Sequence, residues 1–268
     1  MNINYPYSEI QRLIGPSNNI LICLPKGVNF DQVASGLSLY LVLTKNGKSV
    51  NIVAPEPMTV GLSHLVGLDK ISDKLEGRNL ILKINAPIAE IETVSTTDDG
   101  QNLSVVIIPK KDTPAINKEQ ISFSGAQAQG DLIITIGVKK LEDLGKLVTE
   151  NQDLFNQKPI INLDNSDQNA NFGRLNIVDP LASTLSEMTV AVINGLTMPL
   201  DEDVANNLLQ GLKAGTNNFQ DQKVRAETFE AASICLKVGK TVVNQAPPIE
   251  EPPSDWMEPK IYKGSTIS

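Results

Sequence analysis

The 268-residue chain has a single histidine, His64, and only two cysteines, Cys23 and Cys235. One imidazole cannot build a zinc finger or a di-metal site that uses paired histidines. The two cysteines lie far apart and form no C-x-x-C pair, which excludes a redox motif and favours a reducing, cytoplasmic environment. Because His64 lies in an apolar stretch, we expect it to be half-buried and assign it no role.

Aromatic residues make up only 4% of the chain, so aliphatic side chains must form its core. No apolar run approaches the ~20 residues of a membrane-spanning helix, and the first residues show no secretory signal pattern. The net charge of −8 argues against a protein that holds nucleic acid mainly through its overall field. These absences predict a soluble, cytoplasmic protein with no membrane partner.

The hydrophobic pattern predicts an α/β fold with an open, mostly parallel sheet flanked by helices. Residues 19–24 form a continuous apolar run, which is typical of a strand buried on both faces. Helical spacing over 31–45 and a second strand over 48–54 complete a β-α-β unit. Further strands are expected at 131–136 and 159–163. Further helices are expected at 8–14, 141–154, 183–194, 201–212 and 225–238.

Two segments depart from this pattern. Residues 80–125 contain short alternating strands around the turn Asp98-Asp99-Gly100, which predicts an inserted antiparallel β element. After residue 244 prolines and glutamates dominate, which is incompatible with a packed helix or a sheet interior. We therefore predict one α/β domain over residues 1–243, with the β insertion at about 80–125, and an extended Pro-rich tail over residues 244–268.

The tail contains the only tryptophan of the chain. Trp256, Ile261 and Tyr262 lie among prolines, as in short peptides that dock on a protein partner. The partner is unknown. The alternative, that the tail folds back over the surface of its own domain, stays open.

Polar residues follow the predicted parallel strands at their carboxyl ends, where open α/β sheets collect their ligands. Asp31 follows the first strand and Asp164 the last. Taken alone, these residues are better explained by local roles. Asn29 can cap the following helix together with Gln32, and Asp164 can initiate an Asx turn.

Three blocks of the chain resemble the DHH phosphoesterases, in particular the oligoribonuclease and 3′-phosphoadenosine-5′-phosphate phosphatase branch. They comprise residues 31–39, residues 159–187 and residues 205–219. The resemblance runs from about residue 19 to residue 239. It implies the same α/β fold and, in family members, two divalent metals that activate water for phosphoester hydrolysis. The metal is usually manganese, held by histidines and aspartates.

Matched position by position, only Asp31 and Asp164 retain the implied metal-binding residue. The other implied ligand positions hold Pro25, Asn29, Gly137, Asn165, Ser166 and Gly215. No Gly-Gly pair marks the C-terminal substrate domain of the family either. We therefore expect metal-dependent hydrolysis to be lost, leaving a pseudoenzyme with no catalytic residue and no resident cofactor.

Three functions stay open on these grounds. The first is a binding module for a partner protein or a small phosphorylated ligand such as a nucleotide, with Lys26 the only basic residue expected nearby. Its expected polar lining is Asp31, Ser35, Asp164, Asn165, Ser166, Thr216 and Asn217. The second is an active phosphoesterase or nuclease on a small nucleotide or oligonucleotide, using Mn or Mg at a reduced site. The third is a structural homodimer that pairs through the inserted β element.

Overall fold

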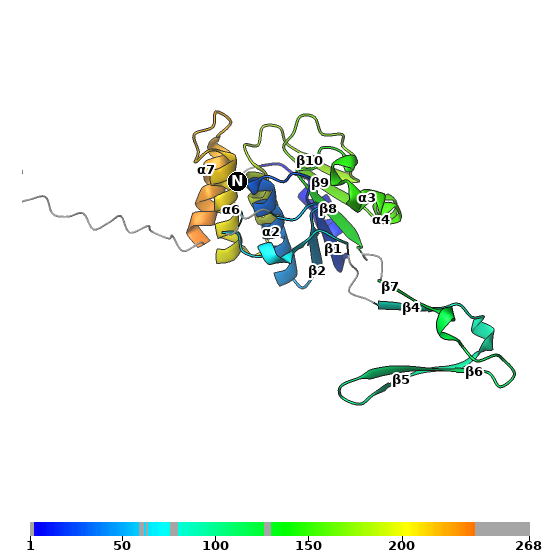
Figure 1. Ribbon diagram of the computed structural model, residues 1–268. Coiled ribbons are helices and arrows are strands. Elements are labelled where there is room, and N and C mark those ends of the chain that lie inside the picture. Colours follow the sequence, from blue (N-terminus) through cyan, green and yellow to red (C-terminus); the bar gives the residue numbers. More distant parts are fainter. Residues whose placement is uncertain (1–2, 59–61, 63, 76–79, 126–129, 239–268) are drawn as a thin grey trace, which may run out of the picture.

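A six-stranded parallel sheet forms the centre of the molecule in the computed structural model, which describes residues 3–58, 62, 64–75, 80–125 and 130–238 (Figure 1). The strand order is β10-β9-β8-β1-β2-β3, and every neighbouring pair is parallel. The strands are β1 (Asn19–Cys23), β2 (Ser49–Val53), β3 (Ile71–Ser72), β8 (Leu132–Ile136), β9 (Ile160–Asp164) and β10 (Leu175–Val178). The predicted α/β class with a parallel sheet is confirmed.

Helices cover both faces of this sheet, because side chains of successive strand residues point to opposite faces. Ile20 and Ile22 of β1 belong to one hydrophobic cluster, whereas Leu21 and Cys23 belong to the other. The larger cluster includes residues of α1 (Tyr7–Ile14), α2 (Phe30–Lys45), α5 (Leu185–Gly195), α6 (Glu202–Gly215) and α7 (Ala226–Val238). The smaller cluster includes residues of the 3-10 helix η5 (Leu141–Leu144), α3 (Lys146–Thr149) and α4 (Gln152–Gln157).

The single helix predicted over 141–154 is wrong, since three short helices replace it. Gly145 lies at φ +52° and ψ −125°, which is not a helical conformation, and Asn151 interrupts the chain again before α4. The sequence pattern also missed β3 and β10. Both are short edge strands with half-exposed residues, so they lack the continuous apolar run that identified β1.

The predicted antiparallel insertion is confirmed as two separate two-stranded sheets. One pairs β4 (Leu80–Ile84) with β7 (Ile121–Gly125), and the other pairs β5 (Ile91–Asp98) with β6 (Leu103–Pro109). Figure 1 shows the insertion extending away from the parallel sheet. At the predicted turn, the Asp99 carboxylate accepts hydrogen bonds from the backbone N–H groups of Gln101 and Asn102. The remaining 3-10 helices are η2 (Leu68–Lys70), η3 (Ile88–Glu90) and η4 (Lys118–Gln120).

Within the described part of the chain, no helix combines the length and the apolar character needed to cross a membrane. The predicted tail over residues 244–268, with Trp256, Ile261 and Tyr262, lies outside the described residues. Its division from the α/β domain therefore stays a prediction.

The helices on the larger face approach each other most closely at Gly211. A methyl group placed on this glycine would overlap the Ser186 hydroxyl of α5 and lie 2.9 Å from the Ala34 methyl of α2. Only a hydrogen therefore fits where α6 crosses α2 and α5.

We predict that Gly211→Ala lowers the free energy of unfolding by about 1–3 kcal/mol, because overpacking forces the helices apart. Urea denaturation measures this change, and Gln210→Ala on the exposed side of α6 is the matched control. Equal stability of the two variants would show that α6 moves without cost.

Candidate functional site

A pocket of about 370 Å³ lies where β1, β8 and β9 end at their carboxyl termini. β1 joins β2 on one side and β8 on the other, so this edge contains the point where the strand order reverses. Open α/β sheets bind their ligands at this point. The lining residues are Asn29, Phe30, Asp31, Gln32, Gly137, Lys139, Asp164, Asn165, Ser166, Ser183, Leu185, Ala214 and Gly215.

The structure brings most of the positions that the sequence singled out to this one pocket. Seven line it: Asn29, Asp31, Gly137, Asp164, Asn165, Ser166 and Gly215. Pro25 and Lys26 line a neighbouring hollow, which shares Gln32, Gly137 and Lys139 with the pocket. All seven are positions that the family resemblance matched to metal ligands, and Pro25 is the eighth.

Three of the expected lining residues lie elsewhere. Ser35 is fully buried, and its hydroxyl lies 3.2 Å from the Ser186 hydroxyl between two helices. Thr216 is fully buried too. Its hydroxyl donates to the Leu212 carbonyl and accepts from Phe219 N–H at the end of α6. Asn217 lines a separate hollow. These side chains support packing and a turn, not the pocket.

His64 lies in the hollow that Asn217 lines, together with Lys213. The expectation that His64 is half-buried is wrong, because the side chain is exposed. Asn217, Asn218 and Phe219 all have positive φ, between 47° and 64°, so three consecutive residues adopt the left-handed conformation. Asparagine tolerates this region better than most residues, which explains the Asn-Asn pair at this turn.

The Asp31 carboxylate is occupied by the beginning of α5. It accepts hydrogen bonds from Leu185 N–H at 2.6 Å, from Ser186 N–H at 2.9 Å and from the Ser186 hydroxyl at 2.5 Å. Burial raises the pKa of the Asp31 carboxyl to about 6, although these hydrogen bonds act in the opposite direction. Asp31, which lies in the first turn of α2, therefore holds the N-terminus of α5 in place.

The Asp164 carboxylate is held by amides. Asn169 donates to it at 2.7 Å, and the backbone N–H groups of Asn165 and Ser166 also donate, as expected for an Asx turn. Burial is the main cause that raises the pKa of the Asp164 carboxyl. Asn169 also accepts from Asn162, which accepts from Thr135 at 2.9 Å, so an uncharged chain of hydrogen bonds supports this wall.

Gln32 fills the space beside the end of β8. Its side chain accepts from Asn29 N–H and donates to the Gly137 carbonyl at 3.0 Å, while Asn29 accepts from Gln32 N–H. The predicted capping pair is therefore confirmed. The same glutamine also joins α2 to the loop after β8.

The pocket does not fit a pair of divalent metals. A Cβ atom at Gly137 would lie 2.6 Å from Gln32 Nε2, and one at Gly215 would lie 2.7 Å from Thr184 Cγ2. An aspartate at either position would require neighbouring side chains to shift, and both oxygens of Asp31 already accept hydrogen bonds from α5. Among the residues that the structure describes, no three His, Cys, Asp or Glu side chains cluster as metal ligands would.

Two pocket groups were missed or undervalued by the sequence analysis. Lys139 lines the pocket two residues beyond Gly137. Its positive charge partly opposes the effect of burial, which raises the pKa of Asp164 overall. The Ser166 hydroxyl accepts from Gln168 N–H, which leaves its own hydrogen free to donate. Lys139 follows a strand end just as Asp164 does, so the same rule applied to β8 would have found it.

The comparisons with known proteins agree with the fold. No protein-family model matches the chain. Among solved structures, an exopolyphosphatase-related protein from Bacteroides fragilis is similar, with a TM-score of 0.61 and 15% sequence identity. The match covers 86% of this chain but only 56% of that protein, so this chain spans little more than half its length. At this identity the likeness shows a shared α/β fold and nothing of the reaction.

The raised pKa of Asp31 gives stability a defined pH dependence. Between the ordinary value of 3.8 and about 6, the folded chain binds a proton at Asp31 that the unfolded chain has lost. The contribution of Asp31 to the free energy of unfolding therefore falls as the pH rises through this window. We predict that the difference between wild type and Asp31→Asn decreases by about 2 kcal/mol from pH 4 to pH 6.

Urea denaturation at several pH values measures this difference. Asp167→Asn is the control, because this exposed carboxylate lies outside the pocket. A constant difference across the window would mean that Asp31 titrates as it does in water.

Proposed function

We propose that this chain is a DHH-type domain that has lost metal-dependent hydrolysis and binds a small phosphorylated ligand in the strand-end pocket. One observation carries the proposal: seven of the positions matched to metal ligands line one pocket, and the only two carboxylates among its described lining residues, Asp31 and Asp164, already accept hydrogen bonds from the protein itself.

The chemistry of the remaining groups favours a single nucleotide. Lys139 provides the one ammonium group on the pocket wall, and the Ser166 hydroxyl provides a neutral donor. Both suit a phosphate monoester. Asp164 can accept from a ribose hydroxyl, since carboxylates hold up to four acceptor sites. A volume of about 370 Å³ is in the range of small-molecule sites.

We predict that AMP binds and that Lys139→Ala weakens its affinity by about 10- to 100-fold, the loss expected for one charge-assisted hydrogen bond. Isothermal titration calorimetry measures the dissociation constant. Lys140→Ala removes a neighbouring exposed charge outside the pocket and should leave it unchanged. If AMP, adenosine and phosphate all fail to bind at millimolar concentration, the proposal that the pocket binds a small phosphorylated ligand is rejected.

Metal binding and hydrolysis are tested on the same protein. Titration with Mn²⁺ or Mg²⁺ should give no heat of binding at millimolar metal, because too few ligands are free. If the wild type instead releases AMP from a dinucleotide in the presence of Mn²⁺, and Asp164→Asn does not, the chain is an active phosphoesterase. Asp164→Asn is preferable to a change at Asp31, whose loss also disturbs α5.

A structural dimer is the second candidate, and the exposed edge of β6 favours it. Leu103, Val105, Val106 and Ile108 are all exposed, and the whole strand carries no charged residue. One edge of β6 pairs with β5, and the other has no strand partner among the described residues. Natural proteins usually protect such edges with charges or proline. β6 has no charge and only a terminal proline, Pro109, so its central residues favour pairing with a second copy.

We predict that the wild-type chain is a dimer at micromolar concentration and that Val106→Lys makes it monomeric. Val106 is the middle residue of β6, so antiparallel pairing would bring its two copies together and place two lysines side by side. Light scattering after size-exclusion chromatography measures the mass. Thr96→Lys on β5 adds the same charge one strand away, and a monomeric wild type would reject the dimer.

A protein partner that docks on Trp256, Ile261 and Tyr262 also stays a proposal. These residues lie outside the described part of the chain. Nothing in the sequence identifies such a partner.

A further inference from the structure

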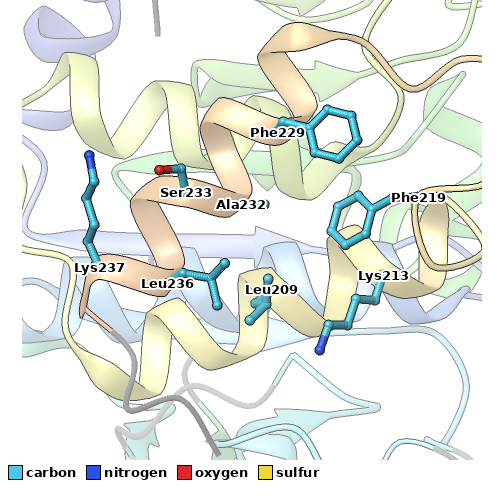
Figure 2. A pocket seen from close by; sticks show the side chains of 8 residues that line it. All are labelled: Leu209, Lys213, Phe219, Phe229, Ala232, Ser233, Leu236 and Lys237. Carbon is cyan, nitrogen blue, oxygen red and sulfur yellow. The ribbon is translucent and has the colours of Figure 1, made fainter. Parts of the chain in front are cut away.

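An apolar groove of about 380 Å³ lies between α6 and α7, apart from the strand-end pocket. Figure 2 shows Leu209 of α6 and Leu236 of α7 between the two helices, with Phe219 and Phe229 side by side near one end. The two phenyl rings are stacked, with centroids 5.6 Å apart. The groove also contains Ala232 and Ser233, so its floor is narrow and its walls are apolar.

Large apolar side chains of this groove remain in contact with water. Phe229 is 56% exposed and Leu236 is 47% exposed. Covering such surface contributes about 25 cal/mol for each Å² of apolar area removed from water. An occupant with an aromatic side chain would therefore gain most of its affinity here.

The charge of the groove selects the kind of occupant. Lys213 and Lys237 lie on opposite sides of it, and none of its described lining residues is acidic (Figure 2). The chain as a whole has a net charge of −8, so this surface differs in sign from the average. A segment with acidic residues around an aromatic anchor is complementary to it.

The chain itself supplies such a segment close by. α7 ends at Val238, one residue beyond Lys237 of the groove, and the chain then continues to Ser268. Residues 249–258 contain four acidic residues, no basic residue and the adjacent pair Trp256-Met257. Trp256 is the only tryptophan of the protein.

The connection is long enough for the segment to return. About 18 residues separate Val238 from Trp256, and an extended chain of this length reaches roughly 60 Å. The groove runs along α7 from Phe229 to Leu236, a rise of about 10 Å. A linker of this kind gives an effective concentration in the millimolar range, so weak contacts suffice for docking.

We propose that residues 249–258 dock in the α6–α7 groove of the same chain, with Trp256 against Phe219 and Phe229. Lys213 and Lys237 then face the acidic residues on either side of the tryptophan. This docking is independent of the proposed ligand, because the groove and the strand-end pocket share no residue.

The fluorescence of Trp256 tests this docking directly, since no other tryptophan contributes. In the full-length protein we expect a blue-shifted emission maximum and a several-fold lower acrylamide quenching constant than in a synthetic peptide of residues 246–268. Leu236→Glu should return both values to those of the peptide. Leu181→Glu is the matched control, because Leu181 is 70% exposed and lies outside the groove.

Thermal unfolding of each variant shows whether it remains folded. If Leu236→Glu unfolds, the double variant Lys213→Glu and Lys237→Glu changes only surface charges and should give the same loss of protection. A solvent-exposed Trp256 in the wild type would overturn the proposal and leave the tail to a partner protein. Protection that survives the groove variants would overturn it too, as would protection that disappears on dilution, which indicates exchange between copies.

Discussion

The carboxylate of Asp31 at the N-terminus of α5 is the interaction on which the site and the helical layer both depend. A buried carboxylate is stable only when other groups replace its lost hydration. In the family that the sequence resembles, metal ions are expected beside this position. Here Leu185 N–H, Ser186 N–H and the Ser186 hydroxyl surround the charge instead. The N-terminus of a helix carries about half a positive charge, which partly replaces the cation.

This arrangement explains why the other ligand positions hold glycine. With α5 drawn onto Asp31, Leu185 Cδ1 would lie 2.8 Å from a Cβ atom at Gly137. Thr184, the residue that caps α5, would in the same way meet a Cβ atom at Gly215. A larger residue at either position would require these side chains of the first turn of α5 to shift. The glycines and the attachment of α5 to Asp31 are therefore mutually consistent parts of one packing arrangement.

The sequence predicted the fold better than the use of individual side chains. Continuous apolar runs identified β1, β8 and β9, because strands buried on both faces need apolar residues at every position. The rule that ligands gather at strand ends found Asp164 and Gly137 in one pocket. It could not show that Asp31 faces a backbone 154 residues further along the chain, or that Ser35 faces Ser186 inside the helical layer. Those contacts depend on how the helices pack, which no local pattern encodes.

The position of α6 decides whether the groove and the pocket can influence each other. Leu209 and Lys213 of α6 line the groove, while Ala214 and Gly215 line the pocket. Gly211 lies between Leu209 and Lys213 on the same helix, and a methyl group in place of its Cα hydrogen would overlap Ser186. A Cβ atom there would also lie 3.2 Å from Asp31 Oδ1, so α6 cannot approach α5 without disturbing the bonds around Asp31. An occupant of the groove therefore adds contacts to a helix that is already fixed from its inner side. Coupling between the two surfaces requires an element with two arrangements, and the close packing of Gly211 against α2 and α5 opposes a shift of α6.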